Sequence, residues 1–154
     1  MGVVGFDHVA FPTTDILRLL AFYRRLGFDI LGEEDLRAGR RLTCSLIVGD
    51  QKINIHSESM VPMRGRPEYL RAPAAEPGCG DLCFVWEGGL DTLLTRLGRL
   101  EVAPIAGPVP RRGGRGGGDT QGVSVYIRDP DDNLIEFISY DPANLTSYGE
   151  EEDR

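Results

Sequence analysis

Apolar and polar residues alternate over several short stretches of the chain, as they do in β-strands that bury one face. The stretches predicted to be strands are 6–11, 28–33, 41–49, 52–56, 81–86, 123–129 and 133–139. Elsewhere apolar residues recur every three or four positions, which is typical of a helix with one buried side. These helices are expected at 13–27 and 90–100.

The predicted elements follow the same order twice. Each half reads strand, helix and three further strands, the last two forming a hairpin, which indicates an internal repeat. In the second half the stretch EVAPIAG (101–107) stands in the place of the first of these three strands. The first module covers 5–56, a linker with four prolines covers 57–78, and the second module covers 79–140. We therefore predict an α+β fold of two tandem βαβββ modules. Together they form a single domain over 1–145, followed by an acidic tail at 146–154.

Four side chains on the predicted strands are able to bind a metal. Aligning the two halves places Asp81 on His8 and Glu136 on His56. Since side chains alternate along a strand, both histidines are expected on the face that the helices leave uncovered. Glu136 lies among apolar residues, where an unpaired carboxylate is expensive to bury. Two imidazoles and a carboxylate suit a divalent transition metal with positions open for substrate.

The alternative for each histidine is an ordinary strand residue that forms hydrogen bonds within the sheet. The position of the three residues in equivalent strands favours metal binding at His8, His56 and Glu136. The cofactor expected is one divalent ion (Fe, Mn, Ni, Co or Zn).

Composition narrows the class of protein. The 154 residues carry a net charge of -7, which argues against nucleic acid as a partner. No apolar run approaches the length of a membrane span, so no membrane partner is expected. The odd set Cys44, Cys79 and Cys83 indicates free thiols in a reducing compartment, and a cytoplasmic protein is expected.

Five stretches resemble the vicinal oxygen chelate superfamily, which includes glyoxalases, bleomycin-resistance proteins and ring-cleaving dioxygenases. They are DHVAF, AFYRRLGF, GDQKINIH, DLCFVW and SVYIRDPDDNLIEFIS, and they extend from residue 6 to about residue 140. The pattern is most similar to small glyoxalase-domain proteins. The resemblance implies a cupped mixed sheet around a metal-binding cavity. It also implies ligand positions at His8, His56, Asp81 and Glu136, and a homodimer.

Asp81 departs from the superfamily pattern, because glyoxalase I and fosfomycin-modifying relatives commonly carry histidine there. Three roles are open for it: a fourth ligand, an acceptor that orients a histidine, or a carboxylate bonded to backbone at the start of a strand.

The function expected is that of a divalent-metal-dependent lyase or isomerase of glyoxalase type, acting on a small oxygenated metabolite. The metal would acidify a C–H beside a carbonyl, and a carboxylate would remove the proton. Glu136 is the predicted catalytic base, with Glu33, Glu34 and Glu58 as alternatives. Two other functions are open: an Fe(II) extradiol ring-cleaving dioxygenase, and a non-catalytic antibiotic-binding protein of the bleomycin-resistance kind.

The Gly- and Arg-rich stretch 107–122 is interpreted as a flexible connector. The alternative is a lid in which Arg111, Arg112 and Arg115 contact an anionic substrate.

Overall fold

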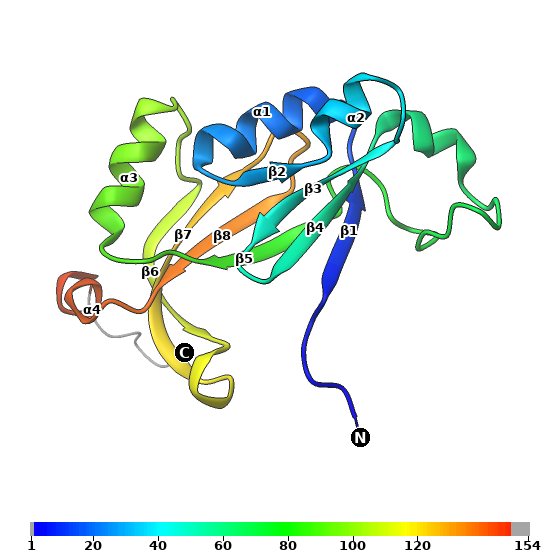
Figure 1. The fold of residues 1–154 in the computed structure, drawn as a ribbon. Helices are drawn as coiled ribbons and strands as arrows, with labels where there is room; N and C mark the ends of the chain where they lie inside the picture. Colours follow the sequence, from blue (N-terminus) through cyan, green and yellow to red (C-terminus); the bar gives the residue numbers. More distant parts are fainter. Residues whose placement is uncertain (1, 149–154) are drawn as a thin grey trace. The chain divides into compact units, whose positions relative to one another are not determined.

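The fold of the computed structural model is the predicted duplication (Figure 1). Residues 2–148 are described, so most of the predicted acidic tail lies outside the described residues. The chain divides into two compact units. Unit 1 runs to Gly80 and includes Pro130–Asp132, whereas unit 2 comprises Asp81–Asp129 and the chain from Asn133 onward.

Unit 1 contains the first four-stranded sheet. Its elements are β1 (His8–Pro12), α1 (Ile16–Leu26), β2 (Asp29–Leu31), α2 (Glu33–Arg37), β3 (Thr43–Val48), β4 (Gln51–His56) and the short 3-10 helix η1 (Glu58–Met63). The strand order is β1-β4-β3-β2. Strand β1 runs parallel to β4, and the other pairs are antiparallel.

Unit 2 contains the second sheet. Its elements are β5 (Asp81–Val85), α3 (Leu90–Arg99), β6 (Ala106–Gly113), η2 (Arg115–Gly117), β7 (Thr120–Arg128), β8 (Leu134–Ser139) and α4 (Pro142–Tyr148). The strand order β5-β8-β7-β6 is that of the first sheet, again with one parallel pair, β5 and β8. The predicted α+β fold of two βαβββ modules is therefore confirmed.

Both long helices bury the apolar side that their spacing predicts. The fully buried leucines are Leu19 and Leu20 in α1, and Leu90, Leu93 and Leu97 in α3. The sheets supply the matching faces, because alternate strand residues are buried. The buried strand residues include Leu46, Ile53 and Ile55 in unit 1, and Val125, Ile127 and Ile135 in unit 2. These faces hold the strands in place, and the opposite faces remain available for polar side chains.

The first residue of each long helix is bonded by a side chain from far along the sequence. The backbone N–H of Ile16 donates to Glu58 Oε2 at 3.0 Å, and that of Leu90 donates to Asn144 Oδ1 at 3.1 Å. These bonds satisfy N–H groups that have no partner within a helix. In α1 the side chain of Asp15 also accepts a bond from the N–H of Arg18, at 3.0 Å.

The interpretation of 107–122 as a flexible connector is wrong for most of its length. Residues 106–113 form strand β6, and the stretch from Thr120 begins strand β7, to which β6 pairs in antiparallel fashion. Backbone hydrogen bonds build this pairing, and they do not depend on apolar side chains. For this reason a Gly-, Pro- and Arg-rich composition concealed a strand.

None of the helices within residues 2–148 combines the length and the apolar character needed to cross a membrane.

Candidate functional site

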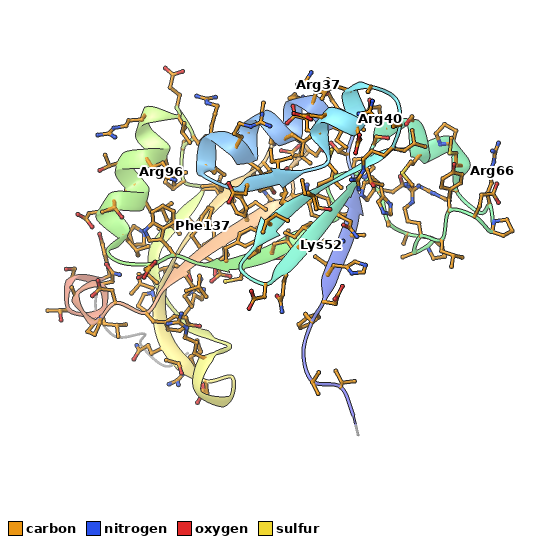
Figure 2. All side chains as sticks on the ribbon, in the orientation of Figure 1. Arg37, Arg40, Lys52, Arg66, Arg96 and Phe137 are labelled. Carbon is orange, nitrogen blue, oxygen red and sulfur yellow. The ribbon has the colours of Figure 1, made fainter. Side chains whose placement is uncertain are left out.

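The pairing of β1 with β4 determines where the two histidines lie. His8 is opposite Lys52, Ala10 is opposite Asn54, and Pro12 is opposite His56. Lys52 is labelled on β4 in Figure 2. His8 and His56 are thus four residues apart along adjacent strands, about 13 Å at the usual rise per residue. Nitrogens on one metal ion lie within roughly 4 Å of each other. The register therefore does not bring the two histidines together.

The equivalent pair in unit 2 has the same register. Asp81 is opposite Leu134 in the β5–β8 pair, and Cys83 is opposite Glu136. Glu136 thus lies two residues beyond the partner of the first-strand candidate Asp81. Two residues beyond the partner of His8 is Asn54.

The sequence alignment of Glu136 with His56 is therefore wrong by two residues. A shift of two residues keeps every side chain on its own face of the strand, so the alternation of apolar residues does not reveal it. Asn54 is the residue that sequence reasoning missed at this position. Comparing the strand pairs β1–β4 and β5–β8 would have found it.

Glu136 is half-buried and held by neutral hydrogen-bond donors. The hydroxyl of Ser124, on the adjacent strand β7, donates to Glu136 Oε1. The thiol of Cys83 also bonds to Glu136. Although the Cys83 residue keeps exposed surface, burial of its thiol raises the pKa to about 12, helped by the negative charges of Glu136 and Asp81. The thiol of Cys83 is therefore neutral.

Tyr126 extends this network on the other side. It lies opposite Glu136 in the β7–β8 pairing. Burial raises the pKa of Tyr126, and the charge of Glu136 raises it further. The Arg111 guanidinium opposes this shift: its Nε donates to the Tyr126 hydroxyl at 3.1 Å and its carbon lies 5.7 Å from the ring centroid. Glu136 is thus an oriented carboxylate beside a phenol and a thiol.

The pair in unit 1 carries different groups. His8 Nδ1 lies 2.5 Å from Asp7 Oδ1, and its side chain is 47% exposed. This hydrogen bond and the charge of His8 lower the pKa of Asp7. Asn54 Oδ1 accepts a bond from the Ser45 hydroxyl at 2.8 Å. With hydrogen on its Nδ1, His8 offers Nε2 as a ligand, in the manner of histidines that a carboxylate orients for a metal.

His56 has a different environment from His8. Its Nδ1 is buried and has no hydrogen-bond partner among the described residues. Burial lowers the pKa of His56, and the nearby charge of Arg71 lowers it further. The ring is therefore a neutral imidazole next to a cation.

The candidate donors of unit 2 carry more carboxyl groups than those of unit 1. Asp81 and Glu136 place two negative charges around one neutral thiol, and such charge favours a metal ion. Among residues 2–148, no group of three or more His, Cys, Asp and Glu side chains is close enough to hold a metal. The ligand set His8, His56, Glu136 and Asp81 stays a prediction.

Two of the alternative bases have structural partners. Glu33 forms ion pairs with Arg24 and Arg37. Burial would raise its pKa, but the hydrogen bonds from these two guanidinium groups lower it overall. Glu58 bonds to the first N–H of α1, and Glu34 is exposed. Glu136 is the one of the four that lies in a network of neutral donors.

The three arginines predicted to form a lid all have partners. Arg111 and Arg112 lie on β6, where Arg112 NH1 is 3.1 Å from Asp119 Oδ1. Arg115 lies over the ring of Tyr140 at 4.7 Å. Their contact with an anionic substrate stays a prediction.

Comparison with known proteins extends over nearly the whole chain. The family model "Glyoxalase/Bleomycin resistance protein/Dioxygenase superfamily" matches residues 5–137. "Glyoxalase domain-containing protein RDO1" of Mycosarcoma maydis is 33% identical over 143 residues, which are 93% of this chain and 72% of that protein.

A bacterial relative agrees in both sequence and structure. "Virulence protein STM3117" of Salmonella typhimurium is 34% identical over 137 residues, covering 87% of this chain and 83% of the relative. Its crystal structure superposes with a TM-score of 0.74 at 32% identity, over 91% of this chain and 99% of that one. Lactoylglutathione lyase from Agrobacterium tumefaciens shares the fold, with a TM-score of 0.64 at 21% identity over 90% and 96% of the two chains.

Proposed function

We propose that this chain, which belongs to the Glyoxalase/Bleomycin resistance protein/Dioxygenase superfamily, is a divalent-metal-dependent lyase or isomerase acting on a small oxygenated metabolite. The glyoxalase domain in the name of RDO1 and the fold shared with a lactoylglutathione lyase support this reaction class. The observation that carries the proposal is the oriented carboxylate of Glu136 among Ser124, Cys83 and Tyr126.

The proposed ligands are His8 and Glu136, with Asp81 as a further donor. For the remaining position the register favours Asn54 over His56, because Asn54 is the repeat equivalent of Glu136. Its amide oxygen is a suitable ligand for a hard divalent ion. Asp7 supports the set by orienting His8.

A divalent ion held by these residues would polarise a substrate carbonyl and so acidify the neighbouring C–H. Glu136 is the proposed base that accepts this proton. The hydroxyl of Ser124 and the thiol of Cys83 hold the carboxylate in place, and both remain protonated while it acts. The hydroxyl of Tyr126 accepts from Arg111 and donates to Glu136, so it helps to orient the same carboxylate.

Solvent deuterium exchange tests the proposal. The full chain, loaded with each of the five candidate metals, is incubated in D₂O with a panel of small α-hydroxy carbonyl compounds and hemithioacetals. NMR should show metal-dependent loss of the proton beside the carbonyl for at least one compound. Glu136→Gln should slow the exchange by about 10²–10⁴-fold, the usual contribution of a general base.

The exposed Glu87 on unit 2 provides a matched control, since Glu87→Gln makes the same chemical change away from the network. Equal exchange rates for Glu136→Gln and the wild type would contradict the role of Glu136. No metal-dependent exchange with any compound would contradict the reaction class.

The dioxygenase alternative is less well supported. The oxygen-activating triad uses two histidines and one carboxylate on a single iron, and the register separates His8 from His56. Anaerobic loading with Fe(II), followed by catechol and air, would give a yellow ring-cleavage product if this alternative held. A metal-free protein that binds bleomycin would instead support an antibiotic-binding function. A homodimer is proposed as well, and light scattering of the purified chain would measure it.

A further inference from the structure

A second polar site lies within unit 1, where β4 ends and the segment after it folds back. A small pocket of about 10 Å³, roughly the space that one water-sized oxygen atom occupies, is lined by His56, Met60, Arg64, Tyr69, Leu70 and Arg71. All six residues belong to unit 1. The predicted linker 57–78 supplies five of them, so this stretch does more than connect the two modules.

Four nitrogen atoms at this pocket are buried without a hydrogen-bond partner. They are Nε, NH1 and NH2 of Arg71 and Nδ1 of His56. They are also the complete set of such atoms found among the described residues. Buried polar groups are nearly always paired in folded proteins, and a buried guanidinium is particularly costly to leave unpaired. The arrangement therefore lacks an acceptor that the described part of the chain does not supply.

The charges of the side chains at the pocket indicate the charge of the missing hydrogen-bond acceptor. Arg71 carries one positive charge beside the imidazole of His56. The second arginine of the pocket, Arg64, is already paired, because its NH2 forms an ion pair with Glu76. One net positive charge with several N–H donors calls for an anion with more than one oxygen.

The geometry of the guanidinium group indicates which kind of anion would bind. Its planar arrangement of donors matches the paired oxygens of a carboxylate or phosphate group. With hydrogen on its buried Nδ1, His56 adds one more donor beside this fork. A metal ion at His56 would face the charge of Arg71, which is a second reason to separate His56 from the metal ligands.

We propose that His56 and Arg71 form a binding site for a small oxyanion, namely the carboxylate or phosphate group of a metabolite. Arg71 provides the bidentate contact, and His56 Nδ1 donates to the same group. The site uses no metal and does not depend on Glu136, so it stands independently of the proposed reaction.

Titration of the metal-free full chain with inorganic phosphate and, separately, with acetate tests this site. Binding is followed in chloride-free buffer by calorimetry, and through the Arg71 Nε–H resonance in ¹⁵N NMR spectra. Saturable binding of at least one anion with a shift of that resonance is expected, and the tighter anion identifies the source of the oxyanion. No binding of either anion, or an Arg71 resonance that does not respond, would overturn the proposal.

Arginine variants locate the binding on the chain. Arg71→Met should lower the anion affinity by roughly 10–100-fold, the range expected for hydrogen bonds to a charged group. Arg71→Lys keeps the charge without the fork and should fall between Arg71→Met and the wild type. The control is Arg66→Met, on the same segment, where Arg66 is exposed and projects outward (Figure 2).

Equal losses in Arg71→Met and Arg66→Met would show general charge attraction and contradict the site. If Arg71→Met does not fold, as judged by circular dichroism, the comparison of Arg71→Lys with Arg66→Lys decides in the same way. His56→Ala should give a smaller loss than Arg71→Met, because it removes a neutral donor.

Discussion

The β1–β4 pair of unit 1 and the β5–β8 pair of unit 2 share one register but carry different groups. Unit 1 places a histidine and an amide at the two equivalent positions, His8 and Asn54. Unit 2 places two carboxylates there, Asp81 and Glu136. The backbone of the duplication is thus preserved while the chemistry has diverged, with an imidazole and an amide in one copy and two carboxyl groups in the other.

The difference shows that equivalent positions in a repeat are defined by strand pairing and not by residue type. His56 resembles a metal ligand by type, yet its partner in the sheet is Pro12 and its charged neighbour is Arg71. Asn54 does not stand out in the sequence, yet it has the same place in its sheet as Glu136.

The largest expected effect is a loss of stability on truncating a buried leucine. It tests whether units 1 and 2 depend equally on their hydrophobic cores. Leu19 in α1 and Leu93 in α3 are both fully buried. Leu19→Ala and Leu93→Ala should each lower the free energy of unfolding by about 2–5 kcal/mol, because a cavity replaces buried methyl groups. Chemical denaturation measures both.

Leu17 in α1 is 40% exposed and supplies the control for these variants. Leu17→Ala should cost less than about 1 kcal/mol. An equal loss in Leu17→Ala and Leu19→Ala would contradict the assignment of the buried side of α1.

The thiol of Cys83 provides a probe of the negative charge in unit 2. With a pKa of about 12, fewer than about one in a thousand Cys83 thiols are ionised at pH 8.5. Exposed Cys79 should therefore react with iodoacetamide at least about 100-fold faster, as measured by mass spectrometry of the two peptides.

The variant Glu136→Gln tests how much Glu136 contributes to the low reactivity of Cys83. Burial is the main cause of the raised pKa of Cys83, and Glu136 adds to it through its charge and its hydrogen bond. Removing the charge should speed the alkylation of Cys83 several-fold and leave Cys79 unchanged. An unchanged rate at Cys83 would show that Glu136 does not contact the thiol.

The smallest expected change in unfolding free energy concerns the side chains that bond to the first residues of the two long helices. Asn144→Ala removes a buried acceptor from the N–H of Leu90, and should cost about 1–2 kcal/mol of unfolding free energy. Glu58→Ala should cost less, about 0.5–1 kcal/mol, since Glu58 is exposed and Asp15 still caps α1. Thermal or urea unfolding of both variants measures the difference, and a larger loss in Glu58→Ala would reverse it.

The fold was predictable because the spacing of apolar residues predicts helices and strands. The repeated order of these elements predicts two modules of the same topology. The buried residues Ile53 and Ile55 follow directly from the alternation in KINIH. Strand β6 was not predictable in this way, because its residues show no apolar alternation. They pair with β7 through backbone hydrogen bonds. Helix α4 lay beyond the repeat and was not predicted either.

The candidate site was predictable only in part. Alternation identifies the face of a residue, and it separates Glu136 and His56 from the buried neighbours Ile135 and Ile55. It carries no information on which residues lie opposite each other in parallel strands, because loops determine that register. The closeness of Arg71 to His56 depends on how residues 57–80 fold, and no periodic pattern of apolar residues in that stretch indicates it.

The central claim is that metal donors occupy register-equivalent positions in the two units. Metal affinities of the wild type, Asn54→Ala and His56→Ala, measured by calorimetry with the metal that supports exchange, test this claim most directly. Asn54→Ala should weaken binding by about 10-fold, equal to about 1.4 kcal/mol, and His56→Ala should match the wild type. Weakened binding in His56→Ala together with unchanged binding in Asn54→Ala would contradict the claim.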